Sequence, residues 1–164
     1  MVNHPDVQKR VQQEIDQVIG QGRVANMEDK ARMPFTEATV LEVFRMSPVA
    51  PLGVPHATSE TTILAGYTIP KDTMIVADFY RILHDENNFQ DPYKFKPERW
   101  LDGDGPRVCL GKGLAEMELF IFLTTLLQNF TFKVPEGEKP PDGVEGFYAD
   151  AFAPRIYNVC AVRR

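Results

Sequence analysis

The sequence contains few cysteines, no long apolar run and no excess of positive charge. Its two cysteines, Cys109 and Cys160, are too few for a disulfide scaffold, so we expect both thiols to lie in a reducing compartment. No apolar run approaches the ~20 residues that a membrane helix needs, and residues 1–6 have neither signal-peptide nor anchor character, which predicts a soluble or peripheral chain. The formal net charge of −5 argues against a surface that binds nucleic acid.

The composition is that of an ordinary globular protein, with 43% hydrophobic and 25% charged residues in a chain of 164. This length and composition predict one globular unit over residues 1–164. Within it, Cys160 is interpreted as a core residue, because a free cysteine commonly behaves as a small buried hydrophobe.

Three helices are predicted from apolar spacing. The first begins after Asn3 and Pro5 and ends at Gly20. Its apolar face consists of Val7, Val11, Ile15, Val18 and Ile19. A second helix is expected from a Thr36 cap to about Ser47, where Pro48 blocks it. The third covers residues 114–127, and its apolar side chains lie almost all round, so we expect the fold to enclose it.

Shorter elements complete the expected fold. Asn26 and Asp29 predict a capped turn before the second helix. Strand-like residues predict one small antiparallel sheet, and two further strands lie near the end of the chain; the five segments are 61–63, 67–69, 74–77, 131–134 and 157–162. His84 and Asp85 are expected in a loop. The predicted fold class is mainly α with small antiparallel β-sheets (α+β).

The stretch from Gly105 to Gly113 carries the strongest chemical signal. Cys109 lies just before a predicted helix, where free N–H groups and the helix dipole favour a thiolate. Gly111 lets a flat ligand lie close to the backbone, and Arg107 offers a forked cation to a carboxylate. These features suit haem iron with an axial cysteine, a ligation that favours O–O bond cleavage. The alternative is a small packing cysteine followed by a turn.

Two other stretches have more than one interpretation. Glu42 and Arg45 share a helix face, so they form either an exposed pair worth a few tenths of a kcal/mol or a buried pair that needs further partners. The apolar residues 49–54 are kept extended by neighbouring prolines, and this segment could line a pocket.

Three motifs in this order resemble the C-terminal half of a cytochrome P450 of the microsomal animal type. They are Glu42-x-x-Arg45, Pro97-Glu98-Arg99-Trp100 and Arg107-x-Cys109-x-Gly111, and their order is more specific than any one of them. The resemblance extends over residues 1–164 and implies part of the P450 fold, with the N-terminal half and the membrane anchor outside this chain. Asp102 stands where the family pattern has Phe, and the eight residues between Trp100 and Cys109 form a shorter segment than related sequences have.

The resemblance also implies roles for single residues. Cys109 would be the axial thiolate ligand of haem b, within a haem-binding stretch that includes Gly105 and Gly111. Arg107 and His56 would hold the haem propionates. Glu42, Arg45 and Arg99 would form a buried triad that locks the loop before the cysteine. Residues bordering the substrate cavity would be Val49, Ala50, Leu52, Val54 and Phe152.

The function implied by this resemblance is that of a haem-thiolate monooxygenase, which inserts one oxygen atom from O2 into a lipophilic small molecule. Electrons would come from an NADPH-dependent flavoprotein reductase at the cytoplasmic face of the endoplasmic reticulum membrane. The alternatives are a catalytically inactive haem-binding or partner-binding fragment and a purely structural helical domain. The chain alone is expected to be poorly soluble, to bind haem weakly if at all, and not to hydroxylate.

Overall fold

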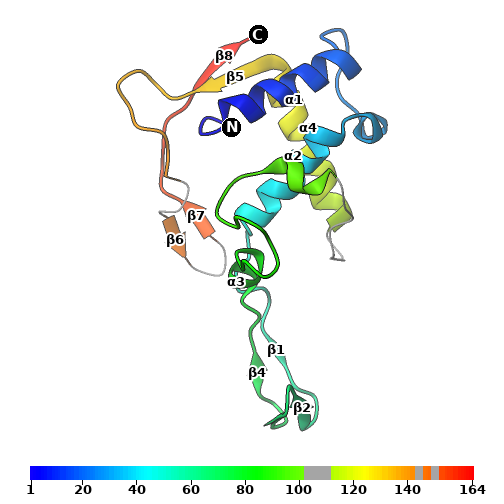
Figure 1. The fold of residues 1–164 in the computed structure, drawn as a ribbon, viewed down its shortest axis with the longest axis vertical. Helices are drawn as coiled ribbons and strands as arrows, with labels where there is room; N and C mark the ends of the chain where they lie inside the picture. The colour runs from blue at the N-terminus through cyan, green and yellow to red at the C-terminus, as the bar shows by residue number, and fades with distance from the viewer. Residues whose placement is uncertain (102–111, 143–145, 149–151) are drawn as a thin grey trace.

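Three long helices pack together, and a narrow arm of short strands extends away from them (Figure 1). The computed structural model describes residues 1–101, 112–142, 146–148 and 152–164. The long helices are α1 (Pro5–Val18), α2 (Pro34–Met46) and α4 (Lys112–Asn129). The fold class predicted from the sequence, helices with small antiparallel sheets, is confirmed.

Helix α1 contributes most of the core through the apolar face that its sequence predicts. Val11 and Ile15 are fully buried, and Val7 and Ile19 are nearly so. They pack with Phe35 of α2 and with Phe120 and Leu127 of α4 in one cluster. Pro5 lies in the first turn, where its missing N–H leaves no hydrogen bond unmade.

The second helix starts earlier than the sequence predicted. It begins at Pro34, so Thr36 lies inside the helix and is not its cap. Proline at the first helical position is favoured by its fixed φ, and this preference outweighed the capping signal of the threonine. The capped turn is confirmed as η1 (Met27–Arg32), in which Asn26 and Asp29 form a reciprocal capping box.

Helix α4 is not enclosed by the described part of the chain. One face is buried through Phe120, Thr124 and Leu127. The opposite face leaves Leu114 58% exposed and Phe122 65% exposed. The apolar character all round α4 therefore exceeds what the described residues bury.

Among the residues that the structure describes, the strands form four separate two-stranded antiparallel pairs rather than one small sheet. The predicted hairpin is β2 (Thr62–Leu64) with β3 (Tyr67–Ile69), and Thr62 lies opposite Ile69. The third predicted strand, β4 (Met74–Ile75), pairs instead with β1 (His56–Ala57). The sequence did not predict β1, because prolines lie close to it. These four strands make the exposed arm (Figure 1). The remaining pairs are β5 (Phe130–Lys133) with β8 (Cys160–Arg163), and β6 (Gly146–Tyr148) with β7 (Phe152–Pro154).

The interpretation of Cys160 as a core residue is wrong. Cys160 starts β8, opposite Lys133 of β5, and its thiol is free and exposed. All four residues of β8 are exposed, since within the described part of the chain this strand pairs with β5 alone and buries neither face.

Strand β5 is joined to α1 by glutamine side chains. The Gln8 amide donates to the carbonyl of Phe132 at 3.0 Å and accepts from its N–H at 2.7 Å. Gln12 Nε2 donates to the carbonyl of Phe130 at 3.0 Å.

None of the helices in the described ranges has the length and apolar content to cross a bilayer.

Candidate functional site

Glu42 and Arg45 lie in the last turns of α2 and are buried together. Glu42 is 0% exposed and Arg45 is 2% exposed. Two parallel hydrogen bonds join them, from Arg45 Nε to Oε2 and from Arg45 Nη2 to Oε1 of Glu42, both 2.9 Å long. A bidentate guanidinium and carboxylate pair is among the strongest polar contacts, and here it is removed from solvent.

Three more donors reach the same carboxylate from residues 96–100, around the short helix η2 (Pro97–Trp100). They are the Lys96 N–H at 2.8 Å, Arg99 Nε at 3.1 Å and Trp100 Nε1 at 2.8 Å. Burial opposes the charged form of Glu42. The hydrogen bonds from Arg45, Lys96 and Trp100 outweigh it and bring the pKa of Glu42 below its ordinary value.

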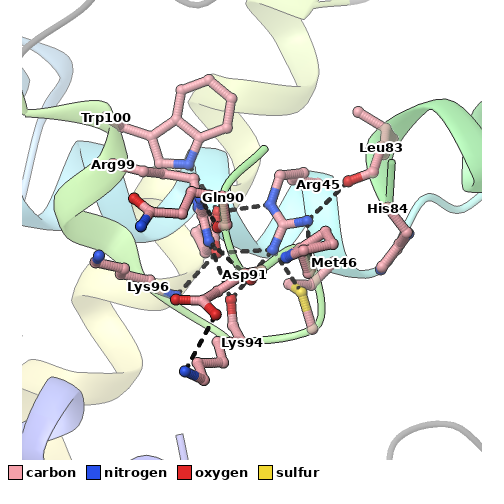
Figure 2. A network of polar contacts seen from close by, with 12 residues as sticks. Arg45, Met46, Leu83, His84, Gln90, Asp91, Lys94, Lys96, Arg99 and Trp100 are labelled. Carbon is pink, nitrogen blue, oxygen red and sulfur yellow. Dashed lines mark hydrogen bonds and ion pairs between the residues drawn. The ribbon is translucent and has the colours of Figure 1, made fainter. Parts of the chain in front are cut away.

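The Nη1 atom of Arg45, which does not contact Glu42, also has hydrogen-bond partners. It donates to the carbonyls of Leu83 at 2.8 Å and Pro92 at 2.7 Å. Leu83 is the last residue of helix α3 (Phe79–Leu83), so one guanidinium connects α2 with α3 and with the loop before η2 (Figure 2). Among the described residues, no buried side-chain nitrogen or oxygen lacks a partner.

This network is suited to holding the backbone in place. A carboxylate that accepts five hydrogen bonds has no free acceptor site for a ligand, and its lowered pKa disfavours uptake of a proton. Breaking such a pair leaves an uncompensated buried charge. The position of the network also supports a role in holding the backbone, because Trp100 lies two residues before segment 102–111, which carries Cys109.

The other predicted site residues lie elsewhere. His56 is the first residue of β1, in the exposed arm, and is itself exposed. Val49, Leu52 and Val54 are 70%, 51% and 74% exposed, and Ala50 is also exposed.

Phe152 begins β7. Four predicted site residues, Gly105, Arg107, Cys109 and Gly111, lie outside the described residues, as does Asp102.

Two participants were missed from the sequence. Trp100 belongs to a motif that was recognised, but only its arginine was assigned a role; an indole N–H beside a buried carboxylate motif is the signal that could have found it. His84 lies in the turn that follows α3, as expected of a loop residue, but it is 6% exposed and stacks on Tyr80 with ring centroids 4.2 Å apart. No pattern of apolar spacing in the sequence indicated that His84 would be buried.

Comparison with known proteins decides the family. A family model described as "Cytochrome P450" matches residues 1–160. This chain belongs to the cytochrome P450 family. The guinea pig (Cavia porcellus) cytochrome P450 2D16 is 45% identical over the whole chain, and human cytochrome P450 2D6 is 44% identical. A zebrafish cytochrome P450 structure with abiraterone superimposes with a TM-score of 0.91 at 36% identity, and covers 99% of this chain.

The P450 match covers only part of the relatives. The chain spans 35% of the guinea pig protein, 36% of the human protein and 41% of the zebrafish chain. The alignment with the guinea pig P450 has 178 positions for 164 residues of this chain, so 14 positions have no counterpart here.

Proposed function

We propose that residues 1–164 form the C-terminal part of a cytochrome P450 domain and hold haem b through the Cys109 thiolate. The observation that carries this proposal is the saturated Glu42 carboxylate, which fixes Lys96, Arg99 and Trp100 immediately before the segment with the cysteine. A rigid attachment at this point limits where the thiolate can lie. Arg107 and His56 are the proposed propionate partners, and Gly105 and Gly111 allow close approach of the ring.

The described residues at the start of α4 fit a flat apolar ligand. A Cβ added at Gly113 would meet no atom of the described residues within 4 Å, so these residues leave the backbone there open to close approach. The neighbouring side chains of Leu114 and Met117 are apolar and 58% and 38% exposed. Haem with a thiolate ligand supplies oxidising chemistry by favouring O–O bond cleavage.

The proposed reaction is that of the family: insertion of one oxygen atom from O2 into a lipophilic small molecule, with electrons from an NADPH-dependent flavoprotein reductase. The proposed cavity border of Val49, Ala50, Leu52, Val54 and Phe152 offers apolar side chains only. Zebrafish P450 structures of the same fold contain abiraterone and progesterone, which supports a lipophilic ligand class.

We place this activity at the cytoplasmic face of the endoplasmic reticulum, with membrane attachment through sequence outside these 164 residues. The named relatives are P450 2D proteins, which supports this location.

A spectroscopic experiment tests the ligand directly. The chain is expressed with added haem, reduced and exposed to carbon monoxide, and thiolate ligation is expected to give a strongly red-shifted Soret band. Cys109→Ser is expected to abolish this band, whereas the control Cys160→Ser should retain it, because Cys160 is an exposed residue of β8. Equal loss in both variants, or a band that persists in Cys109→Ser, would contradict the assignment.

A further inference from the structure

The ring of Phe79, the first residue of α3, lies directly against the backbone of Gly53. A Cβ built on Gly53 would come 2.6 Å from Cε2 of this ring, closer than real Cβ atoms come to other heavy atoms, and 3.2 Å from Cδ2, which is a tight contact. Gly53 also has φ of +63°, in the left-handed region that other residues adopt at a cost. Both the ring contact and the backbone conformation therefore favour glycine here.

The same loop is held by hydrogen bonds as well as by this ring. The Gly53 N–H donates to the carbonyl of Ala50 at 3.0 Å and closes a turn over residues 50–53, so this part of the segment is not extended as the sequence predicted. Pro51 in the second position and glycine in the fourth favour such a turn. The Tyr80 N–H then donates to the carbonyl of Pro51 at 3.1 Å, so two consecutive residues of α3 contact the turn.

Helix α3 is in turn fixed at both ends. The Asp78 side chain accepts from the Arg81 N–H at 2.9 Å and caps its start. At its end, the Leu83 carbonyl accepts from buried Arg45 at 2.8 Å. A continuous series of contacts thus runs from the Glu42 network through α3 to residues 50–53.

We propose that Phe79 is a positioning residue that sets the backbone of residues 50–53 and so the direction of Leu52 and Val54. Both side chains project from the loop, with exposures of 51% and 74%. The consequence for ligands rests on the proposed function, in which residues 49–54 border the substrate cavity. In that case Phe79, which is not among the cavity residues, determines which ligand sizes the cavity accepts.

A double-mutant cycle on the whole chain tests the positioning role without haem. Amide hydrogen exchange at position 53 is measured in the parent, Phe79→Ala, Gly53→Ala and the double variant. Phe79→Ala is expected to speed exchange about tenfold or more. Gly53→Ala is expected to disturb the loop strongly in the parent but less in the Phe79→Ala background, where the ring no longer collides with the new Cβ.

Two further variants keep this cycle interpretable. Ile82→Ala changes an exposed side chain of the same helix and is expected to leave exchange at position 53 unchanged. If Phe79→Ala does not fold, Phe79→Leu provides a smaller side chain at the same place. An effect of Gly53→Ala that is equal in both backgrounds would overturn the positioning role.

The effect on ligands is tested separately with haem-loaded chain. Dissociation constants for imidazole and for the wider 1-phenylimidazole are measured from the Soret shift in the parent and in Phe79→Ala. Their ratio is expected to change about threefold or more, with the band of the reduced carbonyl complex unchanged. An unchanged ratio would overturn the specificity claim, whereas a parent that shows no thiolate band even with excess haem would refute the proposed function and leave the exchange cycle to decide on Phe79.

Discussion

Trp100 donates its indole N–H to Oε2 of Glu42 across 2.8 Å, and it is the only tryptophan in the chain. Its ring also lies 6.0 Å from that of Phe89, centroid to centroid. The indole therefore reports on the buried network itself, since loss of the Glu42 contact or entry of water changes its emission. Intrinsic fluorescence can follow this network without any label.

We expect Glu42→Ala to lower the free energy of unfolding by roughly 3–5 kcal/mol, because it leaves two arginines beside an empty buried position. Denaturant unfolding followed by Trp100 emission measures the change. Glu98→Ala is the matched control, since its ion pair with Arg10 is about half exposed and should be worth less than about 1 kcal/mol. Equal shifts of the midpoint in both variants would contradict a special role of Glu42.

We expect His84 to make the fold less stable as the pH falls below about 6.5. Burial lowers the pKa of His84, and the nearby Arg45 cation lowers it further, against the opposing effects of the Tyr80 carbonyl and Glu42. Between the folded and unfolded pKa values the unfolded chain binds more protons, so acidification favours unfolding until the folded pKa is passed. The pKa values of Glu42 and Asp29 lie below their ordinary range, so both stay charged in this window.

Unfolding free energies at pH 7.5 and 5.5 measure this dependence, and His84→Phe should reduce it by removing the titrating group. His4→Gln is the necessary companion variant, because burial and the terminal amine also lower the pKa of His4. If the dependence disappears in His4→Gln and persists in His84→Phe, His84 does not carry it.

We expect the exposed face of α4 to cause self-association of the chain. Phe122 and Leu126 are 65% and 45% exposed one helical turn apart. Replacing both by Gln should weaken association by about tenfold or more, since burial of each such side chain is worth roughly 1.5–3 kcal/mol.

Sedimentation velocity over a range of concentrations measures the change. Val24→Gln is the control, because Val24 is 69% exposed outside α4. A similar effect of the control would show that association does not depend on α4.

The helices were predictable because their apolar spacing is strong, as the face from Val7 to Ile19 shows. Burial of Glu42 and Arg45 could not be decided from their spacing alone, since an exposed pair has the same separation; the order of three motifs carried that information. The positions of Cys160 and His84 depended on which elements pair with or cover them. Such contacts are made between distant parts of the chain, and local composition does not encode them.

The exchange of two hydrogen bonds between Gln8 and Phe132 also has a consequence for synthesis of the chain. These residues are 124 positions apart. At translation rates of roughly 5–20 residues per second, Gln8 waits about 6–25 s for its partner strand. During that interval α1 cannot complete its contacts with α4 and β5, and its apolar face is available to chaperones on the ribosome.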